Sequence, residues 1–326
     1  MGNAMNVELD RLHAALSRAA RGTVARSHPL ARFTTYRLGG PAEVYVEPAD
    51  FDDLMALGSE LRELDPSGEV PVLVVGRGSN MVVSDAGWPG IALRLGQPFA
   101  ALVTHGDDAA TFEVGAAKPL PLVANWSARR ALAGMEWAVG VPGSIGGGVR
   151  MNAGAHGSDI ARCLVHATVF DLDTGEVSDR SRADLDLGYR HSNLTDRQVV
   201  TAARLGLEPQ ERDEIRVRME SYRRHRSKTQ PGALQNAGST FKNPHGDSAG
   251  RLVEAAGLKG FRVGGASVSE IHANFFMADD AATAQDVFDL IHQVQRRVTD
   301  AFGVELVPEV RFVGPFAHRE AEVFRR

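Results

Sequence analysis

The sequence predicts an α+β protein built from more than one domain. The chain has 326 residues, which is too long for one ordinary hydrophobic core. Apolar residues recur at helical spacing near both ends, whereas the middle is a succession of short apolar segments and turn residues, which is typical of strands. We therefore expect three parts, at residues 1–80, 81–207 and 208–326.

The first part should contain two helices and two strands. A first helix follows from Leu9, Leu12 and Leu16, which recur at helical spacing and are followed by a glycine. Asp50 should cap a second helix, because its carboxylate can accept the N–H groups of a first helical turn. The four elements are expected at residues 7–21, 43–47, 51–64 and 70–75.

The second part should consist mainly of strands, with one helix between residues 119 and 134. The expected strands are residues 91–95, 111–116, 164–171 and 198–207. The segment 171–176 superficially resembles a calcium-binding loop. Its spacing lacks the distal bidentate glutamate of such loops, so we expect a hairpin turn instead.

The third part should open with a charged helix over residues 211–226. A second helix should begin at a cap on Asp280 and end at Gly303, followed by a strand over residues 309–313. The residues that recur at helical spacing within it are Val287, Leu290, Ile291, Val294 and Val298.

Composition and charge exclude several classes of protein. The net charge of −5 argues against a general nucleic-acid binder. No stretch approaches the roughly 18 apolar residues of a membrane span, and the N-terminus has no apolar signal core. The single cysteine, Cys163, rules out an internal disulfide and should be a packed thiol at the start of a strand. We expect a cytoplasmic protein with no metal site, no membrane attachment and no obligate protein partner.

Two glycine clusters suggest a site for a dinucleotide. The first, Gly76-Arg77-Gly78-Ser79-Asn80, follows an apolar run, and the second is Gly140-Val141-Pro142-Gly143-Ser144-Ile145-Gly146-Gly147-Gly148. Small residues expose successive backbone N–H groups, which can bind phosphate oxygens. Neither cluster is a Walker loop, and Met81 stands where a Rossmann fingerprint needs its third glycine. Two tight turns without a ligand are the alternative.

Three further motifs complete a family pattern. They are Gly188-Tyr189-Arg190-His191-Ser192, Asn236-Ala237-Gly238-Ser239-Thr240-Phe241-Lys242-Asn243-Pro244 and Leu306-Val307-Pro308-Glu309-Val310-Arg311. With the glycine clusters, they make residues 33–314 resemble the UDP-N-acetylenolpyruvoylglucosamine reductase family. Because the interval between Arg190 and Ser239 is short, the chain resembles the compact second class of that family, which lacks an inserted tyrosine loop.

The resemblance implies a vanillyl-alcohol-oxidase-type FAD-binding module of two subdomains, followed by a C-terminal substrate-binding domain. It implies non-covalent FAD, with NADPH as co-substrate. The residues expected to bind FAD are Gly76, Arg77, Gly78, Ser79, Asn80, Gly140, Val141, Pro142, Gly143, Ser144, Gly146, Gly147 and Asn152. Arg150 lies near these residues, at a position where the family pattern predicts an apolar side chain.

The implied reaction reduces UDP-N-acetylglucosamine enolpyruvate to UDP-N-acetylmuramate, a step of peptidoglycan synthesis that supports cell shape and division. Hydride addition to C3 places negative charge on C2 and on the adjacent carboxylate, and fixed cations lower that barrier. By resemblance, Arg190 binds this carboxylate, which Arg can hold bidentately. Ser239 supplies the proton to C2, and Glu309 donates a hydrogen bond in its protonated form.

The resemblance also implies substrate-binding residues. They are Tyr189, Lys228, Lys242, Asn243 and His272. His272 could equally be a hydrogen-bonded structural histidine. The basic run at residues 223–226 could be a solvated helix face or could attract a diphosphate.

Two other functions fit part of the pattern. A different oxidoreductase on the same flavin fold accounts for both glycine clusters, but not for the serine motif or the Pro-Glu-Val motif. A non-catalytic nucleotide-sugar-binding protein could lose any one of Arg190, Ser239 and Glu309, yet all three are present.

Overall fold

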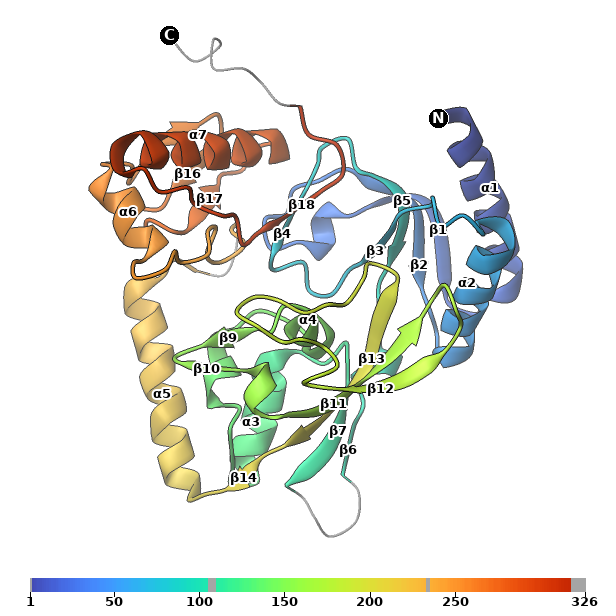
Figure 1. The fold of residues 1–326 in the computed structure, drawn as a ribbon, viewed down its shortest axis with the longest axis horizontal. Helices are drawn as coiled ribbons and strands as arrows, with labels where there is room; N and C mark the ends of the chain where they lie inside the picture. The colour runs from blue at the N-terminus through green and yellow to red at the C-terminus, as the bar shows by residue number, and fades with distance from the viewer. Residues whose placement is uncertain (1, 105–109, 233–234, 318–326) are drawn as a thin grey trace. The chain divides into compact units, whose positions relative to one another are not determined.

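The computed structural model describes residues 2–104, 110–232 and 235–317 (Figure 1). Residue 1 of the expected first part and residues 318–326 of the expected third part lie outside the described residues. The chain forms two compact units, each assembled from separate segments. The first unit runs to His28 and includes Glu43–Arg77 and Gly90–Arg226; the second includes Pro29–Ala42, Gly78–Pro89 and the chain from Ser227. The sequence predicts three parts that divide at residues 80 and 207. This finer division of the chain remains a prediction. In the described ranges, no helix has the length and apolar character needed to cross a membrane.

The first unit begins with two helices and a mixed sheet. Helices α1 (Gly2–Ala19) and α2 (Phe51–Leu64) contact each other. The cap predicted for α2 is confirmed, because the Asp50 carboxylate accepts the Asp53 N–H at 3.2 Å. The sheet has the order β1-β2-β5-β3, with β3 parallel to β5. Its strands are β1 (Thr23–Pro29), β2 (Pro41–Glu47), β3 (Val72–Val74) and β5 (Trp88–Leu93).

A five-stranded antiparallel sheet follows, in the order β12-β11-β13-β7-β6. Its strands are β6 (Leu102–Thr104), β7 (Thr111–Gly115), β11 (Leu164–Asp171), β12 (Val177–Ser181) and β13 (Gln198–Gly206). The turn between β11 and β12 is the expected hairpin. The Asp171 carboxylate accepts the N–H groups of Asp173 and Thr174, so this side chain stabilises the turn itself.

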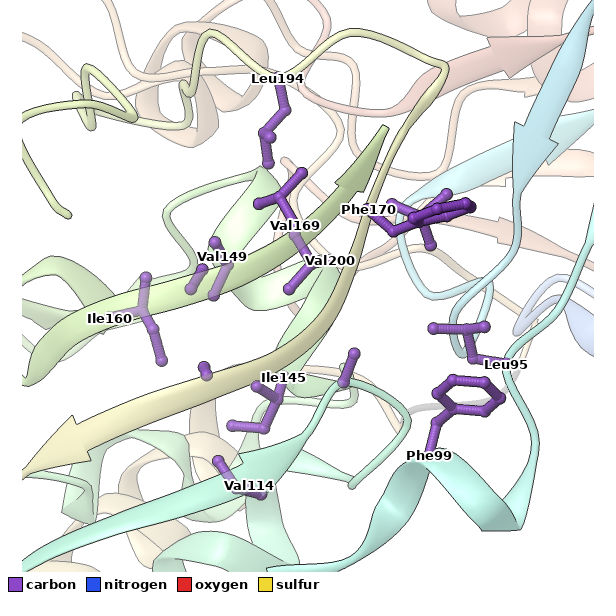
Figure 2. Close-up of a cluster of buried hydrophobic side chains, with 14 of the residues drawn as sticks. Leu95, Phe99, Val114, Ile145, Val149, Ile160, Val169, Phe170, Leu194 and Val200 are labelled. Carbon is purple, nitrogen blue, oxygen red and sulfur yellow. The ribbon is translucent and has the colours of Figure 1, made fainter. Parts of the chain in front are cut away.

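Helices cover this second sheet. The expected helix is α3 (Leu120–Arg129), and a short helix that the sequence did not predict, α4 (Ile145–Arg150), packs on β7 and β13. Figure 2 shows Ile145 and Val149 of α4 among the buried side chains of these strands. Cys163 is also buried here, and burial raises the pKa of its thiol to about 12, as expected of a packed cysteine.

Short elements and one long helix complete the first unit. Strand β8 pairs with β14, and β9 with β10. The charged helix predicted near residue 211 is α5, which begins at Arg212. The bounds are η2 (Gln97–Ala100), β8 (Leu132–Ala133), η3 (Glu136–Gly140), β9 (Gly154–Ala155), β10 (Ser158–Asp159), η4 (Ile160–Arg162), β14 (Glu208–Pro209) and α5 (Arg212–Thr229).

The second unit has its own core between helices and short strands. Strands β15, β16 and β17 form an antiparallel sheet, and β4 pairs in parallel with β18. The bounds are η1 (Ala31–Phe33), β4 (Met81–Val83), α6 (Ala249–Ala255), β15 (Arg262–Val263), β16 (Ala266–Val268), β17 (Phe276–Ala278), α7 (Ala284–Phe302) and β18 (Arg311–Val313).

Helix α7 corrects one expectation about its start. Its N-cap is Thr283, not Asp280: the Thr283 hydroxyl accepts the Asp286 N–H at 3.1 Å, and the Asp286 carboxylate accepts the Thr283 N–H at 3.0 Å. This reciprocal capping box satisfies two backbone N–H groups at once, those of Thr283 and Asp286. A cap at Asp280 alone could not do so. The predicted end is confirmed, because Gly303 has a φ of 67° and terminates the helix.

Candidate active site

The two glycine clusters meet within the first unit. A Cβ atom on Gly76 would lie 2.8 Å from Ser144 Oγ, so the first cluster can approach the second only through a glycine. Ser144 is the N-cap of α4, and its Oγ accepts the Gly147 N–H at 3.4 Å. The segment predicted to bind phosphate is therefore a loop that leads into a helix.

The first cluster carries backbone donors that fit an anion. Across residues 76–80, none of the N–H groups donates to a protein acceptor in the described ranges. In the second cluster, by contrast, Ile145 and Gly146 donate to the carbonyls of Lys118 and Ala116 at 2.9 and 2.8 Å. Successive N–H groups without a protein partner suit phosphate oxygens. The residues present therefore fit the diphosphate of FAD.

Arg190 is held by the segment that follows the second cluster. Its guanidinium donates to the carbonyls of Gly154 at 2.9 Å and Asn152 at 3.5 Å, and it lies 5.1 Å from the centre of the Tyr189 ring. Arg190 has a φ of 55°, a left-handed conformation that is uncommon outside glycine. The surrounding contacts, not the sequence pattern, decide where this side chain lies.

Asn152 supports the segment around Arg190. Its side-chain amide donates to the Gly188 carbonyl at 2.8 Å, and its side-chain oxygen accepts the Ala161 N–H at 3.1 Å. The residue is almost fully buried. Because these bonds engage both ends of its amide, Asn152 connects the second cluster to the residue pair Tyr189–Arg190. A contact between Asn152 and FAD remains a prediction.

The structure explains the unexpected charge at Arg150. Its guanidinium donates to the Thr195 carbonyl at 2.7 Å and to the Asp196 carboxylate at 2.6 Å. The Arg150 carbonyl in turn accepts the Ser192 hydroxyl at 2.6 Å. An arginine at the end of α4 therefore fastens the segment that follows Arg190, a role that an apolar side chain could not perform.

An aromatic cluster joins the hairpin of β9 and β10 to α5. The His156 ring stacks on Tyr222, with ring centres 4.0 Å apart and planes 4° apart, and His225 lies edge-on at 5.9 Å. Among the described residues, His156 Nε2 is buried without a hydrogen-bond partner. Burial, Arg226 and His225 together lower the pKa of His156, so the fold favours its neutral form.

His156 should make the protein less stable in mild acid. A histidine with a lowered pKa in the fold and an ordinary pKa near 6.5 when unfolded binds more protons in the unfolded chain, so stability falls as the pH drops below about 6.5. We expect His156→Phe, which keeps a ring on Tyr222, to narrow the gap between urea midpoints at pH 7.5 and pH 5.5. His13→Gln, outside the cluster, is the control. An unchanged gap in His156→Phe would show that other groups set the acid sensitivity.

In the second unit, the serine motif and the Pro-Glu-Val motif lie on paired segments. Lys242 donates its N–H to the Val307 carbonyl at 2.9 Å, and Glu309 donates its N–H to the Thr240 carbonyl at 2.8 Å. An isolated antiparallel bridge joins Phe241 to Pro308 between them. Two motifs far apart in sequence are therefore neighbours in this unit.

Asn274 holds the other side of the serine motif, a function that the sequence did not predict. Its side chain accepts the Phe241 N–H and donates to the Phe241 carbonyl, both at 2.9 Å. Its own carbonyl accepts the Thr240 N–H at 2.8 Å, and Ser239 forms a bridge with Phe275. Asn274 is almost fully buried, and its amide acts here like a piece of neighbouring strand. A side-chain amide can pair with a backbone in this way because it both donates and accepts. A single asparagine in a sequence does not reveal that function.

The expected substrate residues occupy varied surroundings. Lys228 is exposed near the end of α5, and Lys242 is half-buried beside Ser239 in sequence. The Asn243 side chain accepts the Ala249 N–H at 3.1 Å, at the start of α6. His272 Nδ1 accepts the Asn274 N–H at 3.2 Å, and burial lowers the pKa of this histidine. His272 therefore has a structural hydrogen bond, whichever role it has toward substrate.

The predicted catalytic residues divide between the two units. Arg190 and Tyr189 belong to the first unit, whereas Ser239 and Glu309 belong to the second. Glycine cluster one divides as well, with Gly76 in the first unit and Asn80 in the second. The backbone contacts described above for Arg190 lie within the first unit, and those for Ser239 and Glu309 lie within the second.

Comparisons with known proteins agree with this arrangement. Residues 42–180 match a family model described as an FAD binding domain, and residues 230–313 match one described as the C-terminal domain of UDP-N-acetylenolpyruvoylglucosamine reductase. A protein of that name from Synechococcus elongatus is 43% identical over 298 residues, covering 90% of this chain and 96% of that protein. One from Agathobacter rectalis is 40% identical over 301 residues, covering 89% and 94%. The crystal structure of UDP-N-acetylenolpyruvylglucosamine reductase from Thermus caldophilus matches with a TM-score of 0.73 and 36% identity, covering 90% of this chain and 99% of that one.

Proposed function

Because the chain belongs to the family of UDP-N-acetylenolpyruvoylglucosamine reductases, we propose that it reduces UDP-N-acetylglucosamine enolpyruvate to UDP-N-acetylmuramate with NADPH and bound FAD. The observation that carries this proposal is the pairing of the serine motif with the Pro-Glu-Val motif in the second unit. Neither a general flavin site nor a nucleotide-sugar site needs Ser239 and Glu309 on adjacent segments.

The glycine clusters would hold the cofactor. Bound FAD supplies the hydride that adds to C3 of the enolpyruvyl group. The N–H groups of residues 76–80, which have no protein acceptor among the described residues, would bind its diphosphate, and Ser144 at the start of α4 lies against Gly76. The match of residues 42–180 to an FAD binding domain supports this assignment.

Arg190 would bind the substrate carboxylate. As C3 gains hydride, negative charge moves onto C2 and the carboxylate oxygens, and a guanidinium fixed in advance stabilises that charge without reorganising. Arg190 is fixed in this way, because it donates to the carbonyls of Gly154 and Asn152. A planar guanidinium with five N–H donors can make these bonds and still present others.

Ser239 would complete the reduction by giving its hydroxyl proton to C2. A serine hydroxyl is a weak acid, so the step requires a strongly basic acceptor, which the enolate carbon is. The pairing of the following residue, Thr240, with both Asn274 and Glu309 holds the serine in a defined place. The new C–H bond forms at C2, and solvent returns the proton to the serine oxygen.

Glu309 would act as a protonated acid that donates a hydrogen bond to the developing negative oxygen. We therefore expect Glu309→Ala to slow reoxidation of the reduced enzyme by substrate by about 10²-fold or more, the usual effect of losing one such donor. Glu309→Gln should be distinctly milder, because an amide can still donate. Stopped-flow absorbance under anaerobic conditions measures both rates. Equal losses in the two variants would contradict the protonated-acid role.

An anaerobic experiment tests the whole proposal. The protein is reduced with one equivalent of NADPH, UDP-N-acetylglucosamine enolpyruvate is added, and the visible flavin band is followed. Return of the band with formation of UDP-N-acetylmuramate is the expected result. Reduction without reoxidation in folded protein would favour a different oxidoreductase on the same flavin fold. Flavin that stays attached after denaturation would favour that alternative as well. A colourless protein that FAD cannot reconstitute would favour a non-catalytic nucleotide-sugar-binding protein.

The location of this reaction belongs to the same proposal. The one cysteine, Cys163, is a buried free thiol, which suits a reducing compartment. We propose that the protein acts in the cytoplasm.

A further inference from the structure

Asn80 connects the first glycine cluster to Glu309 within the second unit. Its side-chain amide donates to the Glu309 carbonyl at 3.1 Å, and its own carbonyl accepts the Arg311 N–H at 3.0 Å. From the next residue onward, β4 and β18 pair in parallel, beginning with Met81 opposite Arg311. The asparagine thus begins the contact between the cluster and the strand that follows Glu309.

The two backbone hydrogen bonds of Glu309 run in different directions. Its N–H donates to the Thr240 carbonyl at 2.8 Å, while its carbonyl accepts the Asn80 amide. The peptide groups on both sides of the Glu309 Cα atom are therefore held. Because a peptide group is planar, fixing both of them fixes the direction of the Cα–Cβ bond. The direction in which the Glu309 side chain leaves the backbone is set by these two contacts.

We propose that Asn80 is a positioning residue that acts through Glu309, an inference that rests on the proposed function. The resemblance of the first cluster to flavin-binding loops assigns residue 80 to the cofactor, but its side-chain amide is engaged by the Glu309 carbonyl. The N–H groups of the same cluster remain available to the cofactor. The cluster thereby has two functions: its backbone binds the anion, and the side chain of its last residue orients Glu309.

The inference predicts a selective defect in Asn80→Ala. Affinity for FAD should change little, because backbone N–H groups supply that binding, and reduction by NADPH should keep its rate. Reoxidation by the enolpyruvyl substrate should slow by about 10- to 100-fold, since misplacing a reacting group by about 1 Å can cost 10²-fold. Asn125→Ala is a matched control, because the Asn125 amide donates to the Pro121 carbonyl at 2.7 Å within α3, and no role in the reaction is assigned to Asn125.

A double-variant cycle separates positioning from cofactor binding. If Asn80 acts only through the Glu309 carboxyl group, its replacement should add nothing once that group is gone, so Asn80→Ala/Glu309→Ala should react as slowly as Glu309→Ala alone. If the two losses multiply, Asn80 acts elsewhere and the inference is overturned. A parallel rise in the Kd for FAD, measured by flavin fluorescence, would overturn it as well.

Hydrogen exchange gives a readout that does not depend on activity. In Asn80→Ala, the peptide covering residues 306–313 should exchange faster than in the wild type, whereas Asn125→Ala should leave it unchanged. Unchanged exchange in both would overturn the positioning role. Wild-type protein that is reduced by NADPH but never reoxidised by substrate would overturn the proposed function, and with it this role. Wild-type turnover with an unaffected Asn80→Ala would overturn the inference alone.

Discussion

Ser239→Ala should slow the reoxidation of NADPH-reduced enzyme by substrate about 10³-fold, within the range of 10²–10⁴ that a general acid contributes. Reduction by NADPH should keep its wild-type rate, because that step needs no proton at C2. The expected result is therefore a flavin band that bleaches normally and does not return. Anaerobic stopped-flow absorbance measures both steps on one sample.

The fold should survive this substitution, so the defect can be assigned to chemistry. The backbone around Ser239 is held by Asn274, Phe275 and the turn at Gly238, whose φ is 75°, and none of these contacts uses the serine hydroxyl. Ser267→Ala, in β16 outside the predicted site, is the matched control and should behave as the wild type. Reoxidation of Ser239→Ala at the wild-type rate would show that another group delivers the proton.

Arg197→Met should lower the free energy of unfolding by about 3–5 kcal/mol, the usual cost of removing one partner from a buried ion pair. The Arg197 side chain is 11% exposed and that of its partner, Asp65, is fully buried. Arg197 also donates to the Val70 carbonyl at 2.7 Å. Methionine has a similar length but no donor, so the Asp65 carboxylate would stay buried without its cation.

This ion pair matters because it joins distant segments of the first unit. Asp65 follows the last residue of α2, and its carboxylate accepts the N–H groups of Glu69 and Val70, so it cannot readily turn toward solvent. Urea unfolding with saturating FAD, which keeps the contribution of the ligand constant, measures the loss. Arg216→Met is the control, because the Arg216–Asp213 pair is highly exposed and should contribute little. A similar midpoint in both variants would mean that the first unit does not depend on the Arg197–Asp65 pair.

Two parts of the fold escaped prediction for identifiable reasons. Helix α4 begins inside the second glycine cluster, and glycine is among the poorest helix formers, so its composition suggested only a loop. Burial of Ile145 and Val149 beside β13 stabilises the helix despite that composition. The cap of α7 was misplaced because Asp280 and Thr283 are both suitable residues, and only the reciprocal bond to Asp286 distinguishes them.

The amino-acid sequence by itself determined the elements and the chemistry that depends on near neighbours. Periodicity placed the longer helices and some of the strands, the two glycine clusters indicated a phosphate-binding backbone, and the serine motif pointed to the family. Only the tertiary structure decided that Gly76 meets Ser144, that Asn274 and Asn80 support the segments around Ser239 and Glu309, and that Arg150 is a tether. The reason is physical: propensity and capping act over a few residues, whereas these contacts join residues that are brought together only when separate apolar faces pack.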